Sequence, residues 1–325
     1  MSEMNVIEMG EGGGPEVLVP GRRPVPEPGP NEVLIRVTAA GVNGPDIMQR
    51  KGLYPPPKGA SDLLGLEVSG EVVALGKTVT RLAAGDRVVA LTNGGGYAEQ
   101  VAVLADHCLP LPRGVDETDA AGLCETYFTV WSNLFHGRAV KPGGTFLIHG
   151  GAGGIGSTAI QLGVAFGQRV FATEGSEEGL AFCRDLGAER AIDYRSEDFV
   201  EIVREAGGAD TILDIVGGDY IARNFKAARP DARIVQLAFN KGSKVELNLM
   251  PVMLKRLTYT GSTLRTRPDA FKTAVARELE DQVWPLFAEG RLSTVTHAVL
   301  PLAEAAKAHE MMEAAGHRGK ILLRP

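Results

Sequence analysis

The sequence predicts an α/β protein with one β-rich domain and one domain built on a doubly wound parallel sheet. At 325 residues the chain is too long for one ordinary hydrophobic core. Residues 15–110 hold short alternating apolar and polar runs that Gly and Pro interrupt, which indicates an irregular, mostly antiparallel β domain. From residue 144 the runs become continuously apolar and alternate with stretches of helical spacing, which indicates parallel strands buried on both faces.

The parallel-sheet domain is predicted from five short apolar runs with helical stretches between them. Parallel strands need long crossover connections, usually helices, and these crossovers are right-handed. The runs therefore predict a sheet with helices on both faces. The predicted strands are TFLIHG, RVFATE, RAIDY, DTILDIVG and RIVQLAF, and the predicted helices span 154–167, 177–187, 196–206 and 219–228.

The carboxyl-terminal segment follows neither pattern. After about residue 265 the sequence predicts an Ala- and Glu-rich helix over 268–290, a strand over 295–302 and a second helix over 303–315. We expect these elements to return to the first domain. The expected division is a first domain of residues 1–123 completed by 265–325, and a second domain of residues 124–264.

Composition and charge narrow the class of partner. The chain has 34 Lys and Arg, 40 Asp and Glu, a formal net charge of −6 and no basic run. These values disfavour nucleic acid or an anionic membrane surface as the main partner. The first residues show no secretory signal, and three Cys without C-x-x-C spacing are typical of reduced thiols. We expect a cytoplasmic protein that acts on small molecules.

A glycine-rich segment, GGAGGIG, lies between the first predicted parallel strand and its helix. Gly151, Gly153 and Gly156 fit the G-x-G-x-x-G pattern, and Glu174 ends the next strand. In a dinucleotide site these glycines allow a tight turn, close approach of a pyrophosphate and packing of the helix, in that order. The alternative is a tight turn that binds nothing.

Several segments resemble those of a known family and occur in the same order. They are AAGVNGPDIMQRKGLYPPP, GLEVSGEVVALG, HGGAGGIG, GSEEG and GKILL. Together they resemble the quinone oxidoreductase branch of the medium-chain dehydrogenase/reductase superfamily, which includes zeta-crystallin and the p53-inducible quinone oxidoreductase homologues. The resemblance covers about residues 5–323 and implies a GroES-like catalytic domain with a Rossmann domain inserted into it.

Members of this superfamily differ in whether the catalytic domain holds zinc. The first two matching ligand positions hold Asn43 and Leu66, and Cys124 lies close to the third. One thiol without a Cys or His partner cannot form a three-ligand catalytic site, and the four-cysteine structural lobe is missing. We expect no bound metal. Without zinc to lower the pKa of a hydroxyl group, reduction of an electron-poor acceptor fits better than alcohol oxidation.

Two residues are candidates for the catalytic pocket that the resemblance implies. Asn43 offers an amide donor, with a turn residue as the alternative. Tyr54 offers a phenol and an aromatic face, with a plug under a Pro-rich loop as the alternative. Met48 stands where several family members have a second Tyr, which weakens a simple transfer of quinone preference. His149 is interpreted as a structural residue.

The choice of nicotinamide cofactor has evidence on both sides. Glu174 at the second strand's end favours NADH, because an acid there accepts bonds from ribose hydroxyls and repels a 2′-phosphate. The resemblance favours NADPH, although Glu178 and Gly179 stand where NADPH-dependent family members have a Lys, and Arg195 is a candidate to supply the missing positive charge. We expect NADPH, with NADH a close alternative. The implied cofactor contacts are Thr129, Gly151, Gly153, Gly154, Ile155, Gly156, Glu174, Gly175, Ser176, Tyr194, Arg195, Val216, Ala238, Phe239 and Lys320.

The expected function is zinc-independent, NAD(P)H-dependent reduction of a quinone or a related electron-poor carbonyl compound. The first alternative is an enoyl reductase that reduces the double bond of an α,β-unsaturated carbonyl compound. The second is a catalytically idle NAD(P)H-binding protein that serves as a sensor or structural protein. Comparing the turnover of a quinone with that of a short enone distinguishes the quinone reductase from the enoyl reductase. Cofactor binding without turnover would support the idle protein.

A homodimer is expected through the segment LTYTGST, residues 257–263. In this superfamily the matching strand commonly pairs with its two-fold mate. The segment has β-rich composition with neither Pro nor charge, whereas open edge strands usually carry such protection. The alternative is that the chain's own loop, KVELNLMPVMLK, covers this edge.

Overall fold

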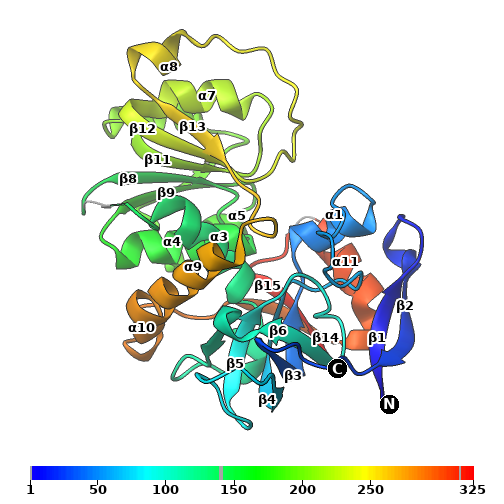
Figure 1. Cartoon of the computed structure of the whole chain (residues 1–325). Helices are drawn as coiled ribbons and strands as arrows, with labels where there is room; N and C mark the ends of the chain where they lie inside the picture. Colours follow the sequence, from blue (N-terminus) through cyan, green and yellow to red (C-terminus); the bar gives the residue numbers. More distant parts are fainter. Residues whose placement is uncertain (1, 139–141, 315) are drawn as a thin grey trace. The chain divides into compact units, whose positions relative to one another are not determined.

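Figure 1 shows the computed structural model, which describes residues 2–138, 142–314 and 316–325. The chain divides into two compact units, one of residues up to 128 and from 265 onward, and one of residues 129–264. Sequence analysis places the first junction at residue 123, immediately before helix α3 (Cys124–Leu134). The change from one unit to the other falls within that helix.

The second unit is built on a six-stranded parallel sheet, which confirms the predicted fold class. The strand order is β10-β9-β8-β11-β12-β13. The order reverses between β8 and β11, and in such sheets ligands bind outside the carboxyl ends of the strands at this point. The strands are β8 (Thr145–His149), β9 (Arg169–Glu174), β10 (Arg190–Asp193), β11 (Ala209–Asp214), β12 (Ala228–Gln236) and β13 (Thr258–Gly261).

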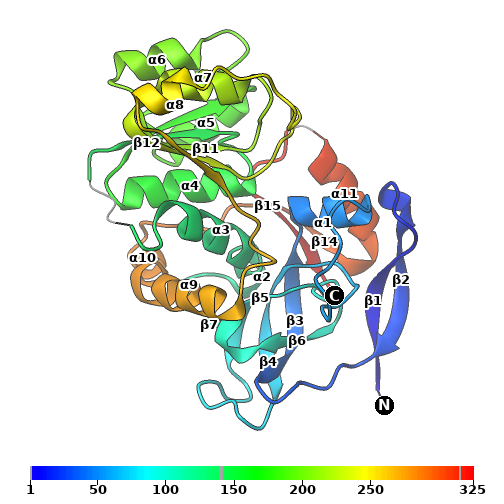
Figure 2. The same ribbon diagram turned by 45° about the horizontal axis from the view of Figure 1, so that its top comes forward.

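Helices cover both faces of this sheet, because successive buried strand residues point to opposite sides. Phe146 packs near Phe135, the residue after α3, whereas Leu147 belongs to an apolar cluster with Phe199 and Phe225. In Figure 2, α3 and α4 accordingly lie on one side and α6 and α7 on the other. The helices are α4 (Gly154–Ala165), α5 (Glu177–Asp185), α6 (Phe199–Glu205), α7 (Tyr220–Ala227) and α8 (Met250–Leu254).

The first unit contains a mainly antiparallel sheet with the order β14-β15-β3-β4-β5-β7, in which β6 also pairs with β3, and a separate β1-β2 hairpin. Its strands are β1 (Glu3–Met9), β2 (Leu18–Pro24), β3 (Glu32–Gly41), β4 (Glu67–Leu75), β5 (Arg87–Leu91), β6 (Gln100–Leu104), β7 (Cys108–Pro110), β14 (Thr296–Pro301) and β15 (Lys320–Arg324). Its helices are α1 (Gly44–Arg50), α2 (Glu117–Ala120), α9 (Asp269–Gln282), α10 (Trp284–Ala288) and α11 (Ala305–Glu313).

The carboxyl-terminal strand β15 pairs with β3 of the same unit. Leu322 lies opposite Gly41, and Leu323 lies opposite Ala40, in antiparallel register. This pairing brings Lys320, at the start of β15, beside the residues that follow β3. The last strand therefore helps to build the polar cluster described below.

Two predicted helices differ from the observed ones for local reasons. The helix predicted over 268–290 is divided at Val283, because Pro285 lies in the first turn of α10 and has no backbone N–H for a continuous helix. The helix predicted to start at residue 196 starts at Phe199, since the Asp198 side chain accepts the backbone N–H of Val200 at 2.9 Å and caps it. Within the described ranges, no helix is long and apolar enough to cross a membrane.

Candidate active site

Asn43 lies between β3 and α1, and its side chain is tied into the protein. It is 4% exposed. Its amide Nδ2 donates to Glu67 Oε1 at 2.9 Å and to the Gly41 carbonyl at 3.3 Å. Its backbone N–H donates to Asp46 Oδ2 at 2.9 Å, and burial raises the pKa of Asp46 to about 6. Both amide N–H groups expected to face a substrate therefore have protein acceptors.

Lys320 supplies a buried positive charge beside Asn43. Its Nζ donates to Asn43 Oδ1 at 2.6 Å and to the Val42 carbonyl at 3.2 Å, and it lies 2.7 Å from Glu67 Oε1. These three acceptors match the three N–H bonds of an ammonium group. The sequence makes Lys320 a cofactor contact, and in this structure its donors are directed to the protein. The cation beside Asn43 is therefore a side chain of the protein itself.

A second buried group of cations surrounds Asn93. Arg265 donates from Nη1 to Gln49 Oε1 at 2.6 Å and from Nη2 to the Asn93 carbonyl at 2.6 Å. Lys272 Nζ donates to Asn93 Oδ1 at 2.8 Å and to the Arg265 carbonyl at 2.9 Å. Burial lowers the pKa of both Arg265 and Lys272. The Arg265 guanidinium carbon lies 5.9 Å from the centre of the Tyr54 ring.

Sequence reasoning selected Asn43 and Tyr54 but missed Gln49, Arg265 and Lys272. Gln49 and Arg265 are 216 residues apart in the chain, so no local spacing joins them. A sequence signal for this group was the position of Arg265, a charged residue at the start of the segment that returns to the first unit. Met48, in the same helix as Gln49, is 43% exposed.

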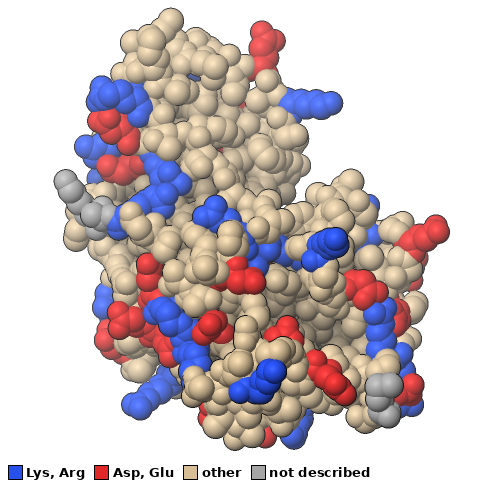
Figure 3. All heavy atoms as spheres, in the orientation of Figure 1, with Lys and Arg blue, Asp and Glu red and all other residues tan. Residues whose placement is uncertain are grey.

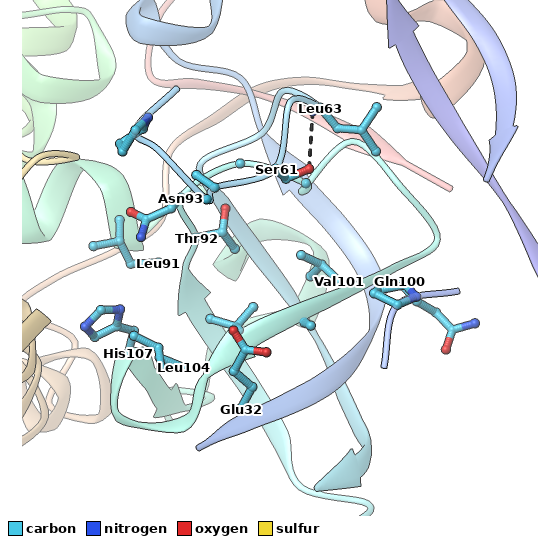
Figure 4. A pocket seen from close by; sticks show the side chains of 18 of the residues that line it. Glu32, Ser61, Leu63, Leu91, Thr92, Asn93, Gln100, Val101, Leu104 and His107 are labelled. Carbon is cyan, nitrogen blue, oxygen red and sulfur yellow. Dashed lines mark hydrogen bonds between the residues drawn. The ribbon is translucent and has the colours of Figure 1, made fainter. Parts of the chain in front are cut away.

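Asn93 also borders a hollow of about 640 Å³ in the first unit. Figure 4 shows its walls, with Leu91 at the end of β5, Thr92 and Asn93 after it, and His107 nearby. The Thr92 hydroxyl donates to the Gly65 carbonyl at 2.7 Å and fixes this loop. The carbonyl and side chain of Asn93 thus connect the wall of the hollow to the buried cations.

The glycine loop of the second unit has the shape that a pyrophosphate needs. The left-handed turn falls on Gly150, with φ +75°, one residue before the expected Gly151. An added Cβ at Gly156 would lie 2.1 Å from the Gly150 carbonyl oxygen, and at Gly151 it would lie 2.5 Å from Cys183 Sγ. At Gly153 its nearest neighbour would be 3.9 Å away. Gly153 therefore faces open space, while Gly151 and Gly156 are required for packing.

Gly153 is also the N-cap residue of α4, with no side chain capping the helix. Gly154, Ile155 and Gly156 form the first turn, whose backbone N–H groups point away from the helix. Such a helix start attracts an anion through these donors and the helix dipole. The loop and helix therefore fit a dinucleotide pyrophosphate.

Glu174 at the end of β9 is turned toward the glycine loop. Its Oε2 accepts the Ala152 N–H at 3.1 Å, and its Oε1 accepts the Gly175 N–H at 2.8 Å. The Ser176 hydroxyl caps α5 by accepting the Gly179 N–H at 3.0 Å. A Cβ at Gly175 would lie 2.3 Å from the Tyr194 hydroxyl oxygen, so Tyr194 covers this turn. These groups gather at one edge of the sheet.

The other predicted cofactor contacts in the second unit follow the carboxyl ends of β10, β11 and β12 or lie in α3. Arg195 is exposed, and its Nε lies 3.3 Å from Asp193 Oδ1. The Val216 N–H donates to Asp214 Oδ1 at 2.6 Å after β11. After β12, the Ala238 carbonyl accepts Gln236 Nε2 at 2.6 Å and Phe239 is 45% exposed. In α3, the Thr129 carbonyl accepts Asn133 Nδ2 at 2.9 Å. The segments after β11 and β12 lie side by side, because the Lys241 N–H donates to the Val216 carbonyl at 2.7 Å.

His149 is held in a buried network. Its Nε2 lies 2.8 Å from Asn224 Oδ1, and Asn224 Nδ2 donates to Asp214 Oδ2 at 2.8 Å. Because the Asn224 oxygen can only accept, the proton of the neutral imidazole lies on Nε2. Burial lowers the pKa of His149, which favours this neutral form. The network fixes the loop after β11, in line with a structural role.

Comparison with known proteins identifies the family. Residues 29–113 match the alcohol dehydrogenase GroES-like domain, and residues 154–280 match the family described as zinc-binding dehydrogenase. The chain is 31% identical to quinone oxidoreductase of Sus scrofa, over 98% of this chain and 97% of the relative. The identity to quinone oxidoreductase 1 of Escherichia coli K12 is 32%, over 98% and 99%. The chain belongs to the zinc-independent quinone oxidoreductase-like group of the medium-chain dehydrogenase/reductase superfamily.

Solved structures of this superfamily agree with the fold. The chain matches a crystal structure of Escherichia coli quinone oxidoreductase in complex with NADPH with a TM-score of 0.87 and 30% identity, over 99% of this chain and all of the other. It matches the CurK enoyl reductase with a TM-score of 0.86 and 26% identity, over 100% and 99%. The protein is thus an oxidoreductase of the medium-chain superfamily.

Long polyketide synthases also contain a related segment. The chain is 34% identical over 300 residues to a mycocerosic acid synthase-like polyketide synthase of Mycobacterium tuberculosis. The matching segment covers 91% of this chain but only 14% of that protein's length. Despite the match to a zinc-binding dehydrogenase family, the described residues contain no group of three His, Cys, Asp or Glu side chains suited to a metal ion.

Proposed function

We propose that this protein uses NADPH to reduce quinones or related electron-poor carbonyl compounds without a metal ion. The observation that carries the proposal is the open, uncapped start of α4 at Gly153, in a chain whose catalytic unit holds its own buried cations. The complex of Escherichia coli quinone oxidoreductase with NADPH supports the choice of cofactor.

The second unit would hold the cofactor. The first turn of α4 would bind the pyrophosphate, and the edge formed by Glu174, Gly175 and Tyr194 would hold the adenosine ribose. Thr129, Val216, Ala238, Phe239 and Lys320 remain proposed contacts. When bound, NADPH supplies a hydride to the acceptor. The protein's own part is to position the acceptor, exclude water and stabilise negative charge.

The first unit would bind the acceptor near Tyr54. The Tyr54 ring offers a stacking surface, and the Arg265 guanidinium group beside it offers positive charge. A cation fixed before the reaction stabilises charge that develops on an acceptor oxygen. Asn43 would act mainly by holding Lys320 and Glu67, because its own amide groups are already bonded.

Cofactor preference is tested by measuring KM for NADPH and NADH with one quinone. The Glu174 carboxylate accepts two backbone N–H bonds, so its negative charge is partly neutralised and directed to the loop. We therefore expect a lower KM for NADPH, with Arg195 contributing to the 2′-phosphate site. A lower KM for NADH would assign Glu174 the usual role of a ribose acceptor.

A double-bond reductase is the second candidate, favoured by the likeness to the CurK enoyl reductase. Both functions share the hydride step, and the acceptor distinguishes them. Faster turnover of benzoquinone than of a short enone supports the main proposal, and the reverse supports the second. Binding of NADPH without turnover of either acceptor supports an idle, sensor-like protein.

We propose a homodimer formed through strand β13. It is the outermost strand of its sheet, and Tyr259 in it is 40% exposed. The alternative was that residues 244–255 cover this edge. Within that segment, Leu249, Met253 and Leu254 are each more than 60% exposed. Figure 3 shows few charged side chains on the face over α8. An open edge beside apolar side chains suits a two-fold interface.

A further inference from the structure

Glu125, the second residue of α3, is a buried acid in the first unit. It is 8% exposed. Its backbone N–H donates to Glu67 Oε2 at 2.8 Å. Within the part of the chain that the structure describes, its carboxyl oxygens make neither a hydrogen bond nor an ion pair. Buried carboxyl groups are almost always bonded, so an exception indicates a function or a ligand.

The charged groups around Glu125 come from several elements. Glu67 of β4 and Asp46 of α1 oppose its ionisation, whereas Lys320 of β15 and Lys272 of α9 favour it. The negative charge of an ionised Glu125 also favours the protonated form of Arg265. Burial is the largest effect and, with the two acids, raises the pKa of Glu125 to about 8. At neutral pH the group is therefore mostly a neutral acid with an O–H to donate.

The nearby cations do not serve as its partners. Lys320 directs its donors to Val42, Asn43 and Glu67, and Lys272 donates to Asn93 and Arg265. A salt bridge that stabilises the fold therefore does not explain Glu125. The Glu125 carboxyl group can therefore form a hydrogen bond with another molecule.

The position of Glu125 on α3 points to the acceptor. Glu125 and Thr129 are four residues apart, so they lie on the same face of the helix about one turn from each other. Thr129 is a proposed contact of the cofactor. Arg265, which lies beside the Tyr54 ring, interacts electrostatically with both Tyr54 and Glu125. The acid thus belongs with the groups proposed to surround the acceptor.

We infer that Glu125 is the acid that donates the proton needed to complete reduction of the acceptor. This inference rests on the proposed function. Hydride transfer gives the acceptor two electrons and one hydrogen, and leaves negative charge on its oxygen. The O–H bond of Glu125 then breaks, a new O–H bond forms on the acceptor, and Glu125 becomes a carboxylate. A proton from water restores the acid before the next turnover.

The kinetic test compares Glu125→Gln with Glu117→Gln across about pH 5 to about pH 9.5, with benzoquinone and NADPH. Gln keeps the size of Glu but has no acidic proton. The unmodified enzyme is expected to lose activity above about pH 8, by about tenfold per pH unit. Glu125→Gln should be at least about tenfold slower and lose this pH dependence. Glu117, which pairs with Arg87 at 2.8 Å, is the control and should keep it.

A second test needs neither cofactor nor turnover. A carboxyl group with a raised pKa in the folded state destabilises the fold as pH rises from its unfolded pKa to its folded pKa. The Tm of Glu125→Gln relative to the unmodified protein should therefore increase from about pH 5 to about pH 8 and then level off. A Tm difference that does not change with pH would show that Glu125 ionises normally, and would overturn the inference.

The two tests separate failure of this inference from failure of the proposed function. If the unmodified enzyme oxidises NADPH with benzoquinone, but Glu125→Gln keeps the same rate and pH dependence, only the role of Glu125 is wrong. If the unmodified enzyme oxidises NADPH with neither benzoquinone nor a short enone, the proposed function fails, and the role of Glu125 fails with it. If Glu125→Gln loses the pH dependence and Glu117→Gln keeps it, the result supports both the role of Glu125 and the proposed function.

Discussion

Lys320 donates a hydrogen bond to Asn43 at 2.6 Å across 277 residues of sequence. This contact joins the last strand of the chain to the segment that holds the predicted catalytic residues. Lys320 also forms an ion pair with Glu67, which is fully buried. The positive charge at this position is thus built into the fold.

Removing that cation should destabilise the fold strongly. Lys320→Met leaves the Glu67 carboxylate buried without its ion-pair partner, and such a change costs about 3–5 kcal/mol. Denaturant unfolding measures this loss. Adding Glu67→Gln should recover part of the stability, because the unpaired charge is gone. Lys307→Met, at an exposed pair with Glu304, is the control and should have little effect. Equal stability of Lys320→Met and the unmodified protein would argue against a structural ion pair.

The glycine loop should tolerate a side chain at one position and not at another. Gly153→Val places a branched side chain in open space where the pyrophosphate is proposed to lie, so NADPH affinity should fall sharply while the fold survives. Gly156→Ala should instead lower the Tm, because its Cβ would collide with the Gly150 carbonyl. Fluorescence titration with NADPH and thermal unfolding measure the two effects. Unchanged NADPH binding by folded Gly153→Val would refute the proposed site.

Much of the second unit can be predicted because its central strands, such as β8, are buried on both faces. Continuous apolar runs such as TFLIHG then mark strands without ambiguity, and the glycine turn marks where the first helix starts. The first unit is harder to predict. Its polar groups come from α1 and its N-cap, β4, α3, α9 and β15, and contacts such as Arg265 with Gln49 depend on tertiary structure. Sequence reasoning found Asn43 through family resemblance, but the bonds that occupy its amide could not be predicted from sequence.

Activity should survive removal of metal ions. Prolonged treatment with EDTA or phenanthroline, followed by assay with NADPH and a quinone, should leave the rate unchanged, because the expected zinc-ligand positions include Asn43 and Leu66. The metal content of the purified protein is the control. Activity lost on chelation and restored by zinc would contradict metal-free catalysis.

The exposed edge of β13 should determine the oligomeric state. Light scattering should give about twice the chain mass of 34.5 kDa. Tyr259→Pro should reduce this to one chain mass, because Pro lacks a backbone N–H and fixes φ. Tyr259→Phe loses only the hydroxyl bond to Gln236 and should remain dimeric. A single chain mass for the unmodified protein would exclude the proposed dimer.

The central claim is that the chain transfers a hydride from NADPH to a quinone. The most direct measurement follows NADPH consumption and hydroquinone formation together in one reaction with benzoquinone, with Gly153→Val as the inactive control. The proposal predicts equal amounts of NADPH consumed and hydroquinone formed, and faster turnover than with a short enone. Tight binding of NADPH without hydroquinone formation would contradict it.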